Sequence, residues 1–225
     1  MITNYKQIGS KVFSRFKNIP ERAFYDFYYF YQHYFDQIVK LEYDEYIEIK
    51  FNYIEALYKL DKYSLFYTQA DSFISELINH QLFNERQQAI FEKILYYKAE
   101  AYKNENKIEE ACKIYAELVK WKSENKEYSR KLFSNLFQTA QINQQDKIAF
   151  VVAFLLSSLV ITGISIFIIN PFYPQFKETM NSFRNLAFAG GIISFIGLQL
   201  MYFRKAKLQM IQMLKKKDEF SQWKL

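Results

Sequence analysis

The sequence contains few side chains that could carry out chemistry. Its only histidines are His33 and His80, and Cys112 is its only cysteine. A zinc site needs three or four well-placed ligands, and this set does not supply them. A haem held between membrane helices would need histidines on apolar stretches, and neither histidine lies on one. We therefore expect no metal site and no cofactor.

Other catalytic patterns are also missing. Glu109 and Glu110 are adjacent carboxylates, but on a helix we expect them to face water rather than act as an acid–base pair. No glycine lies between Pro20 and Gly163, so this region cannot form a glycine-rich phosphate loop. The net charge of +6 is concentrated at the two ends, without a basic stripe for nucleic acid. The sequence indicates a protein that is not an enzyme and binds neither nucleic acid nor a small-molecule substrate.

Two long apolar stretches lie in the carboxy-terminal half. Residues 148–169 are 22 positions without a charge, about 33 Å long as a helix. Residues 186–203 are also uncharged and would give about 27 Å, close to the ~30 Å hydrocarbon core of a bilayer. Neither stretch carries an ionisable residue, so we expect no ion path through them. We predict a transmembrane hairpin over residues 146–203; the alternative is a pair of buried helices in a soluble domain.

Small residues recur at helical spacing within both predicted spans. Those of the first span are Ala149, Ala153 and Ser157, and those of the second are Ala187, Gly190, Gly191, Ser194 and Gly197. Small residues let two helix backbones approach closely in lipid, where no hydrophobic force presses them together. We expect the two rows to face each other in the hairpin, with a helix of a partner subunit as the alternative.

The charges that flank the spans predict the topology. The link at residues 170–185 has almost no net charge, whereas the tail at residues 204–225 is rich in lysine and arginine. The positive-inside rule therefore places both termini on the same, cytosol-like or matrix-like side.

The amino-terminal segment, residues 1–20, is basic and amphipathic. Four lysines and arginines precede the first acid, Glu21, and four apolar residues share one helical face: Ile8, Val12, Phe13 and Phe16. Such segments resemble mitochondrial targeting sequences. The same pattern also fits a surface helix that lies on a membrane or a partner. The sequence leaves both interpretations open.

The region between these ends predicts an all-α domain, because sheet folds need glycine and proline at their turns and none occurs here. Apolar residues recur with helical periodicity. We place about six helices in a domain at residues 21–145, namely 21–41, 44–60, 64–80, 85–104, 107–122 and 125–143. Asn84 and Asn106 stand where helix caps are expected.

One pair of these helices resembles a tetratricopeptide repeat. Ala99, Tyr102, Ala111 and Tyr115 occupy the small, aromatic, alanine and aromatic positions of that repeat. A weaker echo lies 45 residues earlier: Glu55, Ala56 and Lys62 align with Glu100, Ala101 and Lys107. The resemblance implies two helices that cross closely at Ala99 and Ala111.

The order of segments is similar to that of the mitochondrial fission adaptor family. A repeat-like helical domain, a carboxy-terminal membrane anchor and a basic tail follow one another over about residues 44–205. That family has one terminal span and a very short tail, whereas this chain has two spans. The resemblance implies an outer-membrane receptor that recruits cytosolic partners.

The stretch at residues 24–35 is aromatic around most of a helical circumference. Its rings are Phe24, Tyr25, Phe27, Tyr28, Tyr29, Phe30, Tyr31, Tyr34 and Phe35. A helix on the surface of a small bundle should have one polar face, so we expect part of this surface to bind a partner.

Together these features predict a non-catalytic accessory subunit of a mitochondrial inner-membrane respiratory-chain assembly, with cytochrome oxidase favoured. Its expected partners are membrane lipid and the other subunits of the assembly. The alternative is an adaptor-like receptor of the outer membrane.

Overall fold

The computed structural model describes residues 11–79, 84–142 and 145–215. The remaining residues, including His80 and the ends of the predicted amino-terminal and carboxy-terminal segments, lie outside the described residues. All regular secondary structure in the described ranges is helical, which confirms the predicted all-α class. The described residues form two compact units, 11–124 and 125–215.

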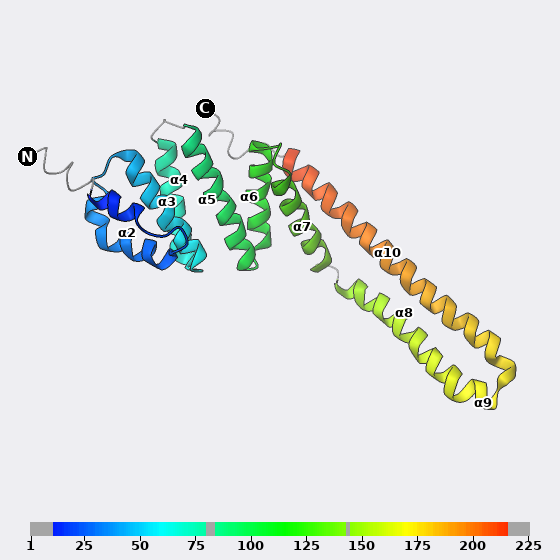
Figure 1. Ribbon diagram of the computed structural model, residues 1–225. Coiled ribbons are helices and arrows are strands. Elements are labelled where there is room, and N and C mark those ends of the chain that lie inside the picture. Colours follow the sequence, from blue (N-terminus) through cyan, green and yellow to red (C-terminus); the bar gives the residue numbers. More distant parts are fainter. Residues whose placement is uncertain (1–10, 80–83, 143–144, 216–225) are drawn as a thin grey trace, which may run out of the picture. The chain divides into compact units, whose positions relative to one another are not determined.

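The first unit consists of helices that pack in chain order (Figure 1). Residues 11–17 are helical. They are followed by α2 (Phe24–Ile38), α3 (Tyr43–Lys59), α4 (Tyr63–Asn79), α5 (Glu85–Asn104) and α6 (Ile108–Trp121). Each helix contacts the next, and α3 also contacts α5. The bounds agree with the predicted ones to within a few residues.

The α3–α4 and α5–α6 pairs turn in the same way. Asp61 and Asn106, 45 residues apart, both have positive φ, at 56° and 60°. The Lys62 amide donates to the Leu57 carbonyl at 2.9 Å, and the Lys107 amide donates to the Tyr102 carbonyl at 2.8 Å. These six-to-one bonds close both helices with a Schellman motif. Aspartate and asparagine tolerate the left-handed conformation, which explains how the turns form without glycine.

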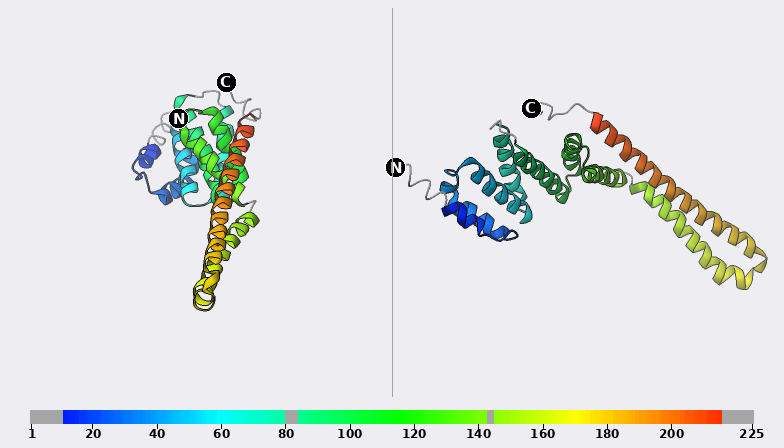
Figure 2. Two further views of the ribbon diagram at one scale, coloured as in Figure 1. Left: turned by 90° about the vertical axis from the view of Figure 1, so that its right-hand side faces the viewer. Right: turned by 45° about the horizontal axis from the view of Figure 1, so that its top comes forward.

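The second unit contains the apolar hairpin. Its elements are α7 (Lys126–Ile142), α8 (Gln145–Ile164), a π-helical turn (Ser165–Ile169), α9 (Asn170–Phe172), a 3₁₀ turn (Pro174–Phe176) and α10 (Lys177–Lys215). Helices α8 and α10 lie side by side and antiparallel (Figures 1 and 2). Helix α7 packs on α10, so the boundary between the units precedes α7 instead of following it at residue 145.

The turn of the hairpin is shorter than the predicted link at residues 170–185. Helix α10 already begins at Lys177 and continues through the second span into the basic tail. The first span runs past Pro171, which lacks an amide hydrogen and would disturb a regular α-helix. The wider π-helical turn immediately before it accommodates this residue. The helix ends at Tyr173, because the residue before Pro174 is pushed out of the α conformation.

Candidate functional site

Two helical segments of the second unit are long and apolar enough to cross a membrane: Lys147–Phe172 and Pro174–Lys215. Only 17% and 11% of their most apolar windows are buried within the structure. The side chains of Phe150, Leu159 and Phe167 are 73%, 70% and 76% exposed. Core helices of a soluble domain would be mostly buried, so these surfaces are suited to lipid or to other apolar helices.

Of the described glycines, Gly191 makes the closest approach to a side chain of the opposite hairpin helix. This glycine is buried, and a Cβ atom placed on it would lie 2.8 Å from Cδ2 of Leu155. A Cβ on Gly190 would lie 3.9 Å from the Phe154 ring, an ordinary contact distance, and Ala187 is half-buried. The absence of a side chain at Gly191 therefore lets α10 approach α8, as small residues do in membrane interfaces.

The predicted row of small residues in the first span is not buried against α10. Ala149, Ala153 and Ser157 are exposed, and the buried positions of the first span include Val151, Ser158, Ser165 and Ile169. The first three of these are seven residues apart, the spacing at which a helix keeps one face toward a nearly parallel neighbour. A row at four-residue spacing drifts around the helix instead. The buried face of the first span therefore includes the small residues Ser158 and Ser165 but not the predicted Ala149, Ala153 and Ser157.

The uncharged stretches of α8 and α10 overlap only in part along the axis of the hairpin. The Ser158 hydroxyl donates to the Arg184 carbonyl at 3.4 Å, so Arg184 is level with the middle of the first span. Lys147, at the start of that span, lines a groove together with Met201. Both helices are free of charge only between these two levels, roughly 16 Å measured along α8 and roughly 25 Å measured along α10. The Arg184 guanidinium donates to the Asn185 side-chain oxygen at 3.1 Å, and an arginine at this depth needs such polar partners.

The predicted repeat positions come together between α5 and α6. Ala99, Ala111 and Tyr115 are fully buried, and the Tyr115 hydroxyl donates to Glu100. Burial and the Glu100 carboxylate both raise the pKa of Tyr115, so its hydroxyl stays protonated and can donate. Tyr102 is half-buried and stacks on Tyr67 of α4, with ring centroids 4.6 Å apart.

The corresponding positions of α3 and α4 were not recognised in the sequence. A shift of 45 residues places Ile54, Leu57, Phe66 and Ala70 opposite the four repeat positions, and all four side chains are fully buried. The contact of α3 with α5 completes the packing of two successive helical hairpins. The 45-residue echo was the signal, but Phe66 and Ala70 exchange the small and aromatic positions of α6, and Ile54 and Leu57 replace Ala99 and Tyr102 with aliphatic residues.

A buried lysine joins α3 to α4. Lys50 is 6% exposed, and its ammonium group lies 2.6 Å from Glu76 Oε2 and 2.7 Å from the Tyr46 hydroxyl. The ammonium also lies over the Tyr46 and Phe73 rings, 5.1 and 5.2 Å from their centroids. A buried charge needs such partners, so this cluster orients the two helices.

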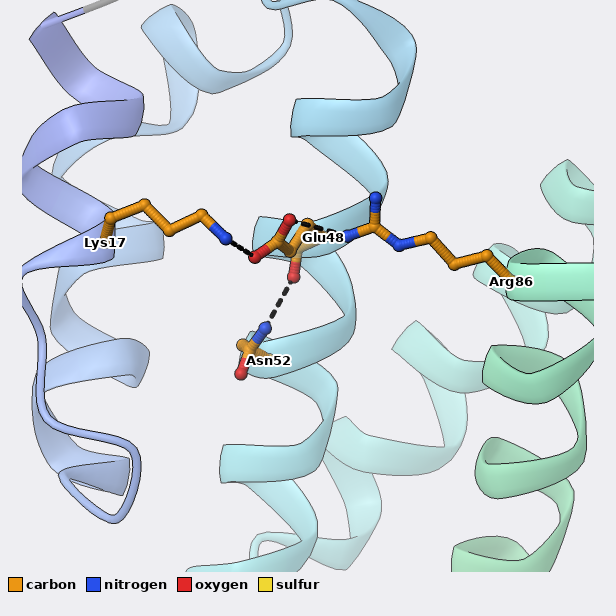
Figure 3. Close-up of polar contacts among 4 residues, drawn as sticks. All are labelled: Lys17, Glu48, Asn52 and Arg86. Atoms are coloured by element: carbon orange, nitrogen blue, oxygen red, sulfur yellow. Dashed lines mark hydrogen bonds and ion pairs between the residues drawn. The ribbon is translucent and has the colours of Figure 1, made fainter.

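The described part of the amino-terminal segment is docked on the first unit. Val12 and Phe16 are buried, and the Lys17 ammonium pairs with Glu48 of α3. The other oxygen of Glu48 lies 2.6 Å from the Arg86 guanidinium of α5, so one carboxylate joins three parts of the chain (Figure 3). Residues 11–17 therefore lie on the protein's own core, a position that neither interpretation of the segment specified.

Part of the predicted aromatic surface on α2 is covered by the rest of the first unit. Phe27 and Tyr31 are buried, and Tyr31 stacks on Tyr53 with centroids 4.1 Å apart. Four further rings, Phe24, Tyr28, Phe30 and Tyr34, are half-buried. The exposed rings are Tyr25, Tyr29 and Phe35. The candidate partner surface is therefore reduced from nine rings to three, because α3 covers much of the circumference.

The few reactive side chains of the first unit are not gathered into a site. Burial, with a contribution from the Glu109 carboxylate, raises the pKa of the Cys112 thiol to about 12. His33 is exposed and lies edge-on to Tyr34, with centroids 4.7 Å apart. Among the described residues no group of three or more histidine, cysteine or acidic side chains could hold a metal ion.

No family model, curated protein or solved structure that was compared with the chain matches it.

Proposed function

We propose that this protein is a non-catalytic, membrane-anchored subunit of a larger membrane assembly. The observation that carries this proposal is the α8–α10 hairpin, whose outer faces are apolar and exposed along two helices of membrane-spanning length. Such a surface needs lipid and neighbouring membrane helices, and the absence of charges from residues 148–169 and 186–203 suits a passive role better than transport.

The assembly that the sequence favours is a respiratory-chain complex of the mitochondrial inner membrane, with cytochrome oxidase as the leading candidate. The basic, acid-poor amino terminus supports a mitochondrial location. Two spans and a basic tail suit lateral docking on a complex better than simple tethering. The first unit, built from successive helical hairpins, has the form of an interaction scaffold.

This proposal is tested by depleting the protein and measuring the assembly. Depletion should lower the amount or the oligomeric state of the complex, as seen on native gels of gently solubilised membranes. The remaining complex should retain its turnover per haem, because the subunit supplies no catalytic group.

A second function, that of an adaptor-like receptor in the outer membrane, is favoured by the repeated hairpins. The α3–α4 and α5–α6 pairs share their turn geometry and their buried positions, as in domains that recruit soluble partners. After solubilisation in mild detergent, an adaptor would be free of other membrane subunits, and the partners that bind it would be cytosolic proteins.

A further inference from the structure

The hairpin helices do not fill all the space between them. A groove with a cavity volume of about 460 Å³ lies beside α8 and α10 near the start of the first span. Its lining is mostly apolar and consists of Lys147, Phe150, Val151, Phe154, Ser194, Gly197, Leu198 and Met201. The volume falls within the range of small-molecule and cofactor pockets.

The groove exists because α10 presents small residues that α8 does not fill. At Gly191 the Leu155 side chain closes the contact, with only 2.8 Å available to a Cβ atom. At Gly197, less than two turns further along α10, a Cβ atom would meet nothing within 4 Å. Ser194, between them, is exposed. These two positions were predicted to pack against α8, and the structure leaves them open.

Only one charged side chain lines the groove, and it stands at the end where the span begins. Lys147 is followed by an uncharged run through Phe172, so in a bilayer its ammonium group would lie at the level of the lipid phosphates. Among the described residues no ion pair involves Lys147. The groove extends from this level by about two helical turns, roughly 10 Å, into the hydrocarbon region.

We propose that this groove binds one phospholipid, with an acyl chain against Gly197 and Ser194 and the phosphate paired with Lys147. The inference rests on the proposed insertion of the hairpin into a membrane. An apolar groove that ends in an ammonium group with no ion pair among the described residues complements a molecule with a hydrocarbon chain below an anionic group. A side chain from a partner subunit would fill the apolar part but would leave the ammonium group without its counter-charge.

The test uses the purified full-length chain in mild detergent, with phosphatidylglycerol added as the probe and native mass spectrometry as the readout. Gly197→Leu fills the groove, and Gly163→Leu is its matched control, because a Cβ atom at Gly163 also meets nothing within 4 Å but this residue does not line the groove. Lys147→Gln removes the charge without filling the space.

We expect the wild-type chain and Gly163→Leu to retain one phosphatidylglycerol, and Gly197→Leu to lose at least tenfold in retention. Lys147→Gln should weaken retention severalfold and abolish a preference for phosphatidylglycerol over phosphatidylcholine. Equal retention by Gly197→Leu and Gly163→Leu would overturn the proposal, as would a partner protein crosslinked from position 197 in place of lipid.

Flotation of the same chains with phosphatidylglycerol-containing vesicles separates this proposal from the one on which it rests. If the chain floats but Gly197→Leu and Gly163→Leu retain phosphatidylglycerol equally, the lipid site in the groove is refuted and the membrane role is not. A wild-type chain that does not float refutes both.

Discussion

Gly191 of α10 lies against Leu155 of α8 so closely that a Cβ atom would stand 2.8 Å from Cδ2 and 3.2 Å from Cγ of the leucine. This contact is the tightest approach that a glycine of the hairpin makes to the opposite helix, and both helices depend on it for their separation.

Gly191→Leu should therefore destabilise the hairpin, because a branched side chain would push α10 away from α8. Overpacking of this kind costs about 1–3 kcal/mol. The measurement is thermal unfolding of the full-length protein in mild detergent. Gly163→Leu, which enters open space, and Ala153→Leu, which enters an exposed position, should unfold as the wild type does. An effect of Ala153→Leu as large as that of Gly191→Leu would contradict the observed face of α8.

A second substitution tests the helix crossing in the first unit. Ala111 is fully buried at the start of α6, so Ala111→Trp should lower the free energy of unfolding by about 1–3 kcal/mol or more. Ala89 is exposed on α5 and offers the matched control Ala89→Trp, for which we expect little change. Denaturant unfolding followed by circular dichroism measures both. Equal unfolding midpoints for Ala111→Trp and Ala89→Trp would show that Ala111 does not lie in a tight contact between α5 and α6.

The Glu48 bridge predicts a dependence on pH. Burial alone would raise the pKa of Glu48, but the Lys17 and Arg86 side chains outweigh this effect and hold the pKa below its ordinary value of 4.5. The carboxylate therefore stabilises the fold above pH 4.5, and this contribution disappears as the pH falls through the lowered pKa. Because Lys17 and Arg86 are about half exposed, the contribution is at most about 1 kcal/mol.

Hydrogen exchange at residues 11–17 measures this bridge. Glu48→Gln should speed exchange at neutral pH and should remove the acid dependence. Asn52→Ala is a suitable control, because the Asn52 side-chain amide donates to the main-chain oxygen of Glu48, at 2.8 Å, and not to its carboxylate (Figure 3). Unchanged protection in Glu48→Gln would mean that Val12 and Phe16 alone hold the segment.

The topology of the hairpin can be read from introduced cysteines. We expect Lys205→Cys and Lys11→Cys to react with a membrane-impermeant thiol reagent from one side, and Lys177→Cys to react from the other. Cys112 should contribute little background, because it is buried and its pKa is raised to about 12. Reaction of positions 177 and 205 from the same side would exclude a spanning hairpin.

The helix bounds of the first unit could be predicted because they depend on local signals. The Asn84 side chain accepts a hydrogen bond from the Gln87 amide at 2.9 Å, as the capping pattern indicated. Between Pro20 and Gly163 the chain has no glycine or proline that could have suggested strands or tight turns. Asn106, also expected as a cap, does not cap α6: Lys107 holds the N-cap position without a side-chain hydrogen bond, and Asn106 instead takes the positive φ of the turn, as Asp61 does.

The features that could not be predicted from the sequence depend on contacts between helices. Which face of α8 meets α10 is decided by the register of the two helices, and Ala153 and Val151 are equally plausible until that register is known. The first span continues to Phe172 because a π-helical segment accommodates Pro171, and such a segment has no distinct sequence pattern. The burial of Lys50 likewise required knowledge that Glu76, 26 residues away, lies within 2.6 Å of its ammonium group.

The central claim, that the chain is a subunit of a membrane assembly, is tested most directly by native sizing. Membranes are solubilised in mild detergent, and the full-length protein is followed with mass spectrometric identification of what migrates with it. We predict a single large species that contains other membrane subunits, with respiratory-chain subunits among them, and its loss in Gly191→Leu but not in Gly163→Leu. A protein that migrates at the size of its own chain, accompanied only by soluble partners, would contradict the claim and support the adaptor function.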